Sequence, residues 1–431
     1  MRKSYKLTAL AAGAALALSA CGAEAEGGGD GADVSLPDDK DMAASISYGL
    51  WDDVQRPAME ELIAGFNEEY PNIDVSITTT PFAQYFTKLQ TQAGGGELPD
   101  VFWLNGPNFQ TYAAEGMIEP LSSLVEAGAI DPANYPDAMN DLYSYEGTMY
   151  AVPKDYDTVA LWYNEELFER AGVDVPTGNW TWEDFTSAAK TISTELEDEG
   201  VYGYAGGTSN QSLVYDAVLQ AGGEIITEDG KSGYDSPEAL KAFEMLAGMV
   251  ADGSSPSIET TAETQPTALF SSGQAAMIWD HNQRSNVFAE SPDFESFNVV
   301  PLPKDERQAT VIHGVGNAMA AEGENKEAAA AFLTYLGGEE AATLQAESGA
   351  ANPAYVGTQD AYVNSIPEID LQIFIDAADE YAFPYPVSRN SSAWLTEEST
   401  YFPRILSGEL PVEEGLSQLA EAVNEHLANE K

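Results

Sequence analysis

Side chains suited to binding a small polar solute recur in the segments that follow the predicted strands. Candidate aromatic platforms are Trp51, Phe82, Tyr85, Trp279, Tyr385 and Trp394. Candidate hydrogen-bonding groups are Asp52, Asn105, Asp155, Asp157, Asn210, Gln211, Asp280, His313 and Arg389. An aromatic ring covers the apolar C–H face of a sugar ring, and planar polar groups exchange hydrogen bonds with hydroxyls. Each ring alone could instead pack in the core, and each Asp or Asn could cap a helix or a turn.

Strands and helices alternate early in the chain, and this order would bring those loops together. Alternating apolar residues predict strands over 45–50, 73–77 and 99–104. Helical spacing predicts helices between them, over 57–70 and 85–93. Such alternation is typical of a parallel sheet with helices on both faces. Ligands of these sheets bind beyond the carboxyl ends of the strands, which here are residues 51–53, 79–82 and 105–106.

The later part of the chain continues with the same kinds of element. A strand is predicted over 201–205 and a helix over 211–221, joined by the polar segment 206–210. Further helices are predicted over 237–252, 327–336, 339–348 and 413–427. A loop rich in Pro and Ser spans 381–394 and contains Arg389.

The stretch from Tyr150 to Trp182 is the most informative part of the chain. Its apolar run Val159–Tyr163 predicts a buried strand, preceded by the polar residues Lys154, Asp155 and Asp157. A short helix is predicted over 165–171, with Gly172 as its carboxyl-terminal cap. Thr181 can cap the next helix together with Asp184.

This stretch resembles the middle of family 1 extracellular solute-binding proteins, the sugar-binding subunits of bacterial ABC importers. The matching residues are Tyr150, Pro153, Asp155, Trp162-Tyr163-Asn164, Leu167-Phe168, Ala171-Gly172, Pro176, Thr181-Trp182 and Phe185. A second block resembles the motif Phe-x-x-Gly-(Lys/Gln)-Ala-Ala-Met of the family and spans Phe270 to Met277. The segments Pro99-Asp100-Val101, Pro301-Leu302-Pro303 and 311–316 resemble further elements of the family.

The resemblance implies an α/β, two-lobe fold of the periplasmic-binding-protein type (type II), in which each lobe is a mainly parallel sheet flanked by helices. Residues 46–155 with 282–335 would form lobe 1, and 156–281 with 336–431 would form lobe 2. The ligand would lie in the cleft between the lobes. The resemblance places contacts in loops that contain Asn105, 155–158, 208–211, Trp279-Asp280, His313-Gly314 and Arg389.

The resemblance also implies a function without catalysis. The two lobes would close on a carbohydrate by a hinge, and the closed form would deliver it to the permease subunits of an ABC importer. We expect a monomer that needs no cofactor and is not an enzyme.

The amino-terminal segment predicts export and lipid attachment. Basic residues at positions 2, 3 and 6 precede an apolar run from Leu7 to Ala20. At about 1.5 Å per residue this run spans about 21 Å, which is shorter than the roughly 30 Å hydrocarbon core of a bilayer. The run ends in Leu18-Ser19-Ala20-Cys21, which matches the bacterial lipobox. We therefore expect a lipoprotein signal peptide over 1–21, a flexible tether over 22–45, and a lipid anchor on Cys21 at the outer face of the cell membrane.

Composition excludes several other classes of function. The chain of 431 residues carries 71 acidic against 18 basic residues, a net charge of −53, which repels nucleic acid and anionic lipid headgroups. Its one cysteine allows no disulfide within the chain and no zinc site built from thiolates. Three histidines make a multi-histidine metal site improbable.

Two other ligand classes or functions stay open at this point. The same fold could bind glycerol phosphate or another small polar solute, although Lys154, Arg284 and Arg389 are the few basic residues near the candidate loops. A secreted glycoside hydrolase would need two carboxyl groups roughly 5–10 Å apart, and acidic residues are abundant. However, neither a G-x-S-x-G nor an H-E-x-x-H motif is present. We therefore predict a carbohydrate-binding lipoprotein.

Overall fold

The structure is a computed structural model that describes residues 34–430. The predicted signal peptide, the lipobox with Cys21 and most of the predicted tether lie outside these residues. The end of the predicted tether is packed against the rest of the chain. Val34 is buried in the core, and its carbonyl oxygen accepts a hydrogen bond from the hydroxyl of Ser123.

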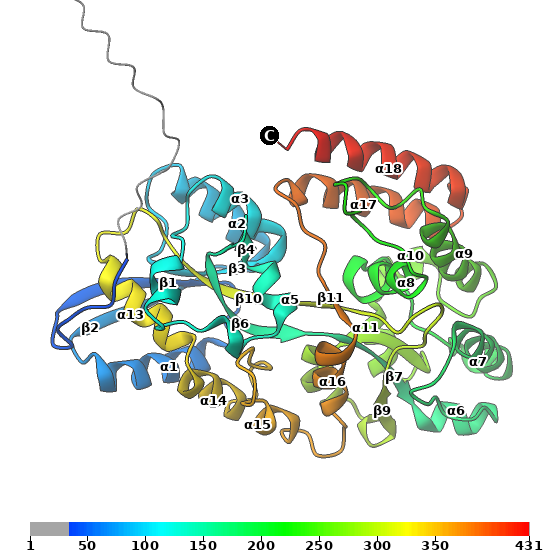
Figure 1. Cartoon of the computed structure of the whole chain (residues 1–431). Helices are drawn as coiled ribbons and strands as arrows, with labels where there is room; N and C mark the ends of the chain where they lie inside the picture. The colour runs from blue at the N-terminus through cyan, green and yellow to red at the C-terminus, as the bar shows by residue number, and fades with distance from the viewer. Residues whose placement is uncertain (1–33, 431) are drawn as a thin grey trace, which may run out of the picture. The chain divides into compact units, whose positions relative to one another are not determined.

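Six strands form the first sheet. These are β1 (Ala44–Leu50), β2 (Ile73–Thr79), β3 (Val101–Asn105), β6 (Ala151–Asp157), β10 (Thr310–Met319) and β11 (Ala382–Pro384). As predicted, β1 pairs in parallel with β2 and β3. The long strand β10 runs antiparallel to β3 and β6, and its first residues pair in parallel with β11 (Figure 1).

Helices pack around this sheet because each buries one apolar face. They are α1 (Arg56–Glu69), α2 (Phe82–Ala93), α3 (Gly106–Ala114), α4 (Ser122–Glu126), α5 (Asp137–Leu142), α13 (Lys326–Leu336) and α14 (Glu339–Glu347). A hairpin of β4 (Ser144–Tyr145) and β5 (Thr148–Met149) follows α5. In α1, Met59, Leu62 and Phe66 are buried at helical spacing, as the sequence predicts.

The second sheet has three described strands, and its central strand is the predicted apolar run. β7 (Val159–Asn164) pairs with β8 (Met277–His281) and β9 (Phe297–Val300), and both pairings are antiparallel. The expectation of a mainly parallel sheet in each lobe is therefore wrong for this sheet. All six residues of β7 are buried, so its uniform apolar run indicated burial and left the strand direction open.

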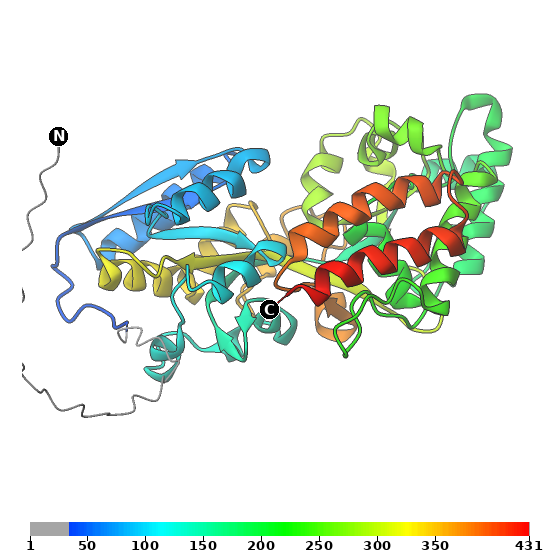
Figure 2. The same ribbon diagram turned by 90° about the horizontal axis from the view of Figure 1, so that it is seen from above.

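The helices that follow β7 accompany the second sheet. They are α6 (Glu165–Ala171), α7 (Trp182–Glu195), η3 (Asn210–Tyr215), α8 (Asp216–Gln220), α9 (Pro237–Ala251), α10 (Ile258–Glu263), α11 (Pro266–Ser271), α12 (Ser285–Ala289), α15 (Asp360–Val363), α16 (Gln372–Glu380), α17 (Ser391–Leu406) and α18 (Val412–Ala428). Helices α17 and α18 run side by side (Figure 2). The predicted caps are confirmed: Gly172 is left-handed with φ 65°, and Thr181 and Asp184 form a capping box.

The predicted strand over 201–205 is wrong. This segment makes one isolated parallel bridge, between Tyr202 and Ala275. A Cβ atom on Gly203 would lie 1.9 Å from the carbonyl oxygen of Ala189, so the backbone packs directly on α7. Most residues of this segment are buried, as expected for a strand. However, the close approach of the backbone to α7 takes the place of a regular ladder of hydrogen bonds between strands.

The chain passes between the two sheets at the single residue Thr158. This residue separates β6 from β7, is fully buried, and donates a hydrogen bond to the carbonyl oxygen of Phe374 at 2.9 Å. The return runs from β9 to β10. The two passages are tied together, because the amide of Val159 donates to the hydroxyl of Thr310 at 3.0 Å.

The strand pairings also bear on the predicted lobe ranges, which stay a prediction. The range 282–335 assigned to the first lobe contains β9, yet β9 pairs with β7 of the second sheet. Helix α14 lies in the range assigned to the second lobe, and it packs against α1 and α13. Such long-range packing leaves no local signal in the sequence.

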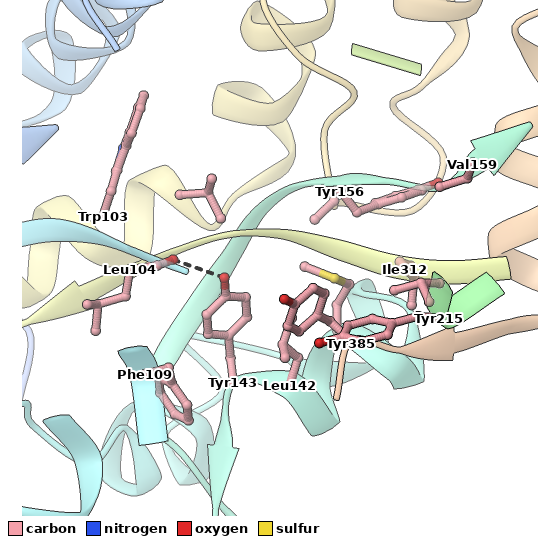
Figure 3. Packing of buried hydrophobic residues seen from close by; sticks show 14 of the residues in the cluster. Trp103, Leu104, Phe109, Leu142, Tyr143, Tyr156, Val159, Tyr215, Ile312 and Tyr385 are labelled. Carbon is pink, nitrogen blue, oxygen red and sulfur yellow. Dashed lines mark hydrogen bonds between the residues drawn. The ribbon is translucent and has the colours of Figure 1, made fainter. Parts of the chain in front are cut away.

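Aromatic side chains hold the centre of the first sheet together. The hydroxyl of Tyr143 donates to the carbonyl oxygens of Leu104 and Gly314, at 2.9 and 2.7 Å (Figure 3). Tyr143 therefore connects β3 with β10 from the segment after α5. Its ring packs edge-to-face on Phe109, with 5.4 Å between ring centroids.

Replacing Gly314 by alanine should destabilise the protein strongly. A Cβ atom at this position would lie 2.0 Å from the carbonyl oxygen of Asp155 on the paired strand β6. Because both backbones are fixed by the sheet, we expect a loss of about 3 kcal/mol or more in the free energy of unfolding, measured by urea denaturation. Gly248→Ala is the matched control, because its Cβ would meet nothing within 4 Å. In helix α9 that change should stabilise the protein by about 0.5–1 kcal/mol. Equal effects at the two positions would contradict this prediction.

Candidate functional site

A cavity of about 490 Å³ lies beside strand β8. Its volume falls within the roughly 300–1,000 Å³ that is usual for small-molecule sites. Trp279 and Asp280 are the predicted ligand residues that line it. Most of the rest of its wall comes from the segment before η3, from η3 itself, and from helices α10 and α11, while Arg284 and Pro403 complete it. Hydroxyl and amide side chains in this wall belong to Tyr204, Thr208, Ser209, Ser212, Thr261, Gln265 and Thr267.

Trp279 lines the cavity on the side that adjoins the protein core. Its side chain is buried, and its ring packs against Phe185 and Tyr204 with centroid separations of 5.3 and 6.0 Å. The indole Nε1 is buried and has no hydrogen-bond partner among the described residues. A buried N–H without a hydrogen-bond partner carries a free-energy cost.

A second buried ring nitrogen without a hydrogen-bond partner lies two residues further along β8. His281 also lines the cavity, and its Nε2 is buried without a hydrogen-bond partner. Its Nδ1 lies 3.1 Å from a carboxylate oxygen of Asp280. Asp280 in turn accepts from the hydroxyl of Thr267 at 2.9 Å. The strand therefore presents Trp279, Asp280 and His281 to one cavity.

Charges around β8 compensate one another. Burial raises the pKa of Asp280, but the hydrogen bonds and charge of His281 and the charge of Arg284 outweigh burial and hold that pKa below its ordinary value. Burial lowers the pKa of His281, while Asp157 and Asp280 together raise it above its ordinary value. The guanidinium of Arg284 lies 3.6 Å from Asp280. The charges on the cavity wall therefore largely cancel.

Asp157 occupies the junction between the two sheets rather than the cavity wall. It is the last residue of β6, and its carboxylate accepts from the side-chain amides of Gln211 and Gln283 at 2.6 and 2.9 Å. His281 Nε2 lies 3.9 Å from the same carboxylate. Burial raises the pKa of Asp157 to about 6, and the opposing charge of His281 reduces this shift.

Asn210 and Gln211 lie behind the cavity wall and make hydrogen bonds to residues outside it. The side-chain amide of Asn210 donates to the hydroxyl of Tyr385 at 2.9 Å and to the carboxylate of Glu398 at 3.2 Å. Gln211 donates to Asp157, as described above. Neither residue lines the cavity, whereas Ser209 and Ser212 on either side of them do. Whether they contact a ligand stays a prediction.

Asp155, His313, Gly314 and Tyr385 form a polar layer along β6 and β10. Asp155 is buried, pairs with Lys154 at 2.6 Å, and accepts from the amide of Val315 at 2.9 Å. The ring of His313 packs on Tyr385 at 4.7 Å, and burial lowers the pKa of His313 to about 3. Tyr385 also packs on Tyr215, as Figure 3 shows. These residues are brought together, with most of their polar atoms engaged within the protein.

Three predicted aromatic platforms lie together at the end of β1, away from the cavity wall. The ring of Trp51 packs on Phe82 and Tyr85, with centroids 5.7 and 5.2 Å apart. Tyr85 is a buried core residue whose hydroxyl donates to the carbonyl oxygens of Gly49 and Trp103. Phe82 is 54% exposed, so the cluster presents one apolar ring to solvent.

The remaining predicted residues make local structural contacts. Asp52 accepts from the amide of Val54. Asn105 directly precedes α3, and its side-chain oxygen accepts from the side-chain amide of Asn108. The guanidinium of Arg389 pairs with Glu115 at 2.7 Å, away from the cavity. Trp394 is fully buried, and its Nε1 donates to Ser388. Their roles in ligand binding stay predictions.

Sequence reasoning missed four residues of this region. His281 follows Trp279 and Asp280 directly, so its place on the same strand could have been found. Thr267 lines the cavity from α11, and no sequence motif marks it. Gln283 reaches Asp157 from a short turn, and Glu398 reaches Asn210 from the middle of α17. These last two depend on tertiary packing, which leaves no signal in the sequence.

The described residues include neither a cluster suited to a metal ion nor a helix suited to crossing a membrane. Within residues 34–430 no group of three or more His, Cys, Asp or Glu side chains could hold a metal ion. In the same range, none of the helices is both long enough and apolar enough to cross a membrane.

Comparison with known proteins identifies relatives over most of the chain. Residues 52–343 match the model of a family described as bacterial extracellular solute-binding protein. A binding protein of Brucella abortus is 27% identical over 288 residues, which are 65% of this chain and 68% of that protein. The arabinooligosaccharide-binding protein of Halalkalibacterium halodurans is 24% identical over 318 residues, 70% of this chain and 68% of that protein.

The fold has a solved counterpart. An ABC substrate-binding protein of Listeria monocytogenes, determined in complex with cycloalternan, superposes with a TM-score of 0.82 at 28% identity. The match covers 90% of this chain and 100% of that one. The predicted two-lobe α/β fold is confirmed by this likeness.

The buried carboxylate of Asp157 should make stability depend on pH. Because its pKa is raised from 3.8 to about 6, the stability it contributes is fully present below about pH 4 and is lost as the pH rises through about 6. The unfolding free energy of the wild type relative to Asp157→Asn should therefore fall by up to about 3 kcal/mol between about pH 4 and pH 7. Urea denaturation at several pH values measures this difference.

Asp184→Asn is the control of opposite sign. Hydrogen bonds from the amide and hydroxyl of Thr181 lower the pKa of this exposed carboxyl group. Its contribution should therefore be present at neutral pH and lost as the pH falls. A pH-independent difference between the wild type and Asp157→Asn would contradict the assignment of Asp157 as a buried carboxylate.

Proposed function

We propose that this chain, which belongs to the family of bacterial extracellular solute-binding proteins, captures a neutral carbohydrate outside the cell and delivers it to the permease of an ABC importer. One observation carries the choice of ligand. The cavity beside β8 combines the buried ring of Trp279, two ring nitrogens without partners and a wall of hydroxyl groups. A polyhydroxy ligand supplies both the C–H faces and the hydrogen-bonding groups that such a wall lacks.

The relatives support this ligand class. The protein of Halalkalibacterium halodurans is named for arabino-oligosaccharides, and that of Listeria monocytogenes was solved with cycloalternan. We infer that the ligand of this chain is likewise an oligosaccharide.

Charge in the cavity favours a neutral ligand over glycerol phosphate. Among the described residues that line it, the charged side chains are Asp280, His281 and Arg284. Arg284 and His281 are already paired with Asp280. A phosphate would need several free donors of positive charge, and it would be repelled by the carboxylate of Asp280.

The same wall does not favour glycoside hydrolysis. That reaction uses two carboxyl groups on opposite sides of the scissile bond. Among the described lining residues, Asp280 is the one carboxylate. The membership of the family and the nature of its relatives also favour binding and transport over catalysis.

Hinge closure would couple binding to delivery. The two sheets are connected where β6 passes into β7 at Thr158 and where β9 leads back to β10. We propose that rotation about these passages closes the two lobes, and that the ligand stabilises the closed form by contacting both. A transporter that binds the closed form alone would then respond to the loaded protein.

We also propose that the mature protein is a monomer anchored through a lipid on Cys21. The lipobox and the preceding apolar run support this arrangement. Because Val34 is buried in the folded part, a tether of about 12 residues between Cys21 and Val34 would give it a reach of roughly 20 Å above the membrane.

Ligand class can be tested by a thermal-shift screen of residues 34–431 against neutral oligosaccharides, polyols and glycerol phosphates. A ligand that binds the native state alone stabilises it by about 2.7 kcal/mol at a hundredfold excess over Kd, so the melting temperature must rise. We expect a rise with one class of neutral oligosaccharide. A rise with phosphates alone would replace our ligand class by an anionic one.

Trp279→Phe should then weaken binding of that oligosaccharide about tenfold, because an aromatic face is kept and the indole donor is lost. Both this change and the control below shrink a buried ring, but Nε1 of Trp279 has no hydrogen-bond partner among the described residues to lose, so the melting temperature without ligand should fall less than in the control. Trp394→Phe is the matched control. It removes the hydrogen bond to Ser388, so it should lower the melting temperature and leave the affinity unchanged. Equal affinities of wild type and Trp279→Phe would remove Trp279 from the site.

Cys21→Ala should abolish attachment to the membrane. Without the thiol that receives the lipid, the exported protein would be released into the medium of a Gram-positive host. Immunoblotting of membrane and medium fractions measures the distribution, and the wild type should stay with the membrane. Retention of Cys21→Ala in the membrane fraction would contradict lipid anchoring at this residue.

A further inference from the structure

Glu398 is a buried carboxylate for which the transport function described above supplies no role. It lies in the middle of α17, is 1% exposed, and takes part in no ion pair among the described residues. Its oxygens accept from the hydroxyls of Tyr215 and Tyr234. The third donor is the side-chain amide of Asn210, at 3.2 Å. A carboxylate held in this way fixes the groups that surround it.

Asn210 connects this carboxylate to the wall of the cavity. It is the first residue of η3, whose helical backbone is interrupted at Ser212 (φ −87°, ψ 18°). The residues on either side, Ser209 and Ser212, line the cavity. An interrupted helix has fewer regular hydrogen bonds of its own, so its shape depends on where its side chains are fastened.

The segment 209–213 is fastened at two points on different elements. Asn210 is bound to Glu398 of α17, and Gln211 is bound to Asp157 at the end of β6. These partners lie behind the wall to which Ser209 and Ser212 contribute. The two fastenings therefore restrict the position of Ser209 and Ser212, while a direct contact of Asn210 or Gln211 with the ligand stays a prediction.

The directions of the hydrogen bonds favour an ionised carboxylate. The carboxylate accepts from the hydroxyls of Tyr215 and Tyr234 and from the side-chain amide of Asn210. The same amide also lies within hydrogen-bond distance of the hydroxyl oxygens of Tyr385 and Tyr215, at 2.9 and 3.2 Å. Protonation would turn an accepting oxygen of Glu398 into a donor among groups that already donate to it, so it would hold Asn210 less strongly.

We propose that ionised Glu398 is a positioning residue that holds the segment 209–213 through Asn210, and thereby sets the cavity wall for the ligand. The inference rests on the proposed function in so far as it concerns affinity. It predicts that the protein binds its oligosaccharide more tightly when Glu398 is charged.

The surroundings of Glu398 allow this titration near neutral pH. Burial raises its pKa to about 7, against the opposing hydrogen bonds from Tyr234, Tyr215 and Asn210. The titratable groups that face it are the phenols of Tyr215, Tyr234 and Tyr385. Burial raises the pKa of each phenol, so all three stay neutral in this range. Affinity should therefore rise several-fold between about pH 6.5 and pH 8.5.

Glu398→Gln tests the proposal with two measurements. Titration calorimetry with the oligosaccharide found by the screen should give an affinity about tenfold weaker than wild type at about pH 8.5, and one that varies less with pH. Hydrogen exchange of the ligand-free protein should show faster exchange of the amides in 209–214, corrected for the intrinsic rate at each pH. Glu397→Gln removes the same charge from the neighbouring position, where Glu397 contacts His426, and should change neither result.

The two measurements separate this proposal from the proposed function. If the wild type binds no oligosaccharide, the proposed function fails, while exchange in 209–214 still decides whether Glu398 holds the segment. Unchanged affinity and unchanged exchange in Glu398→Gln would overturn the proposal.

Tyr234→Phe serves if Glu398→Gln does not fold. It removes one donor to the charged form and keeps the ring that packs on Phe243 and Phe402. The rise in affinity should then move to higher pH, because the charged form has lost a donor. A pH profile identical to that of the wild type would also overturn the proposal.

Discussion

A carboxylate enclosed at the junction of two sheets must be supplied with hydrogen-bond donors, and the arrangement of this protein around Asp157 meets that requirement. Asp157 ends the strand that enters the crossing at Thr158. Its donors are Gln211, from the helix beside the cavity, and Gln283, from the turn after β8. One buried group therefore ties the first sheet to the two segments of the second part that form or support the cavity wall. If these bonds were lost, the position of the crossing and the shape of the cavity would change together.

The cavity differs from the surroundings of Asp157, because some of its polar groups have no hydrogen-bond partner. Most polar groups around Asp157 and Glu398 are satisfied within the protein, which makes that region rigid. Beside β8, in contrast, Nε1 of Trp279 and Nε2 of His281 have no hydrogen-bond partner among the described residues. Both kinds of group are useful in a solute-binding protein. Groups whose hydrogen bonds are satisfied within the protein fix the cavity wall, and groups without partners can bind the ligand. The pairing of Asp280 with His281 and Arg284 keeps the wall near neutrality, which suits a solute that carries hydroxyls and no charge.

Much of the fold could be predicted from local pattern. Helical spacing gave α1, α9 and α18 to within one or two residues, and the capping residues Thr181 and Gly172 marked helix boundaries because their chemistry is local. The apolar run of β7 predicted a buried strand but did not indicate whether it pairs in parallel or antiparallel. The failures came from contacts between distant segments: the packing of Gly203 on α7, and the pairing of β9 with β7. No spacing rule reports such contacts.

The candidate site divides in the same way. Trp279 and Asp280, which follow a recognisable motif, lie on a strand that lines the cavity, and their contact with a ligand stays a prediction. Tyr85 and Trp394 have the right residue type and lie in the core, since an aromatic ring at a strand end or in a helix is equally suited to packing. Asn210 and Gln211 lie in the right loop, yet their side chains are engaged behind the wall. Glu398 could not be predicted at all, because a glutamate on an amphipathic helix is ordinarily exposed, and its burial depends on Tyr215 and Tyr234 arriving from elsewhere in the chain.

Binding of a neutral oligosaccharide in the cavity beside β8 can be tested by a crystal structure of residues 34–431 grown with the oligosaccharide that raises the melting temperature. We expect a sugar ring against the wall that contains Trp279, with a ligand oxygen accepting a hydrogen bond from the indole Nε1. An oligosaccharide bound elsewhere, with the cavity filled by water alone, would contradict it.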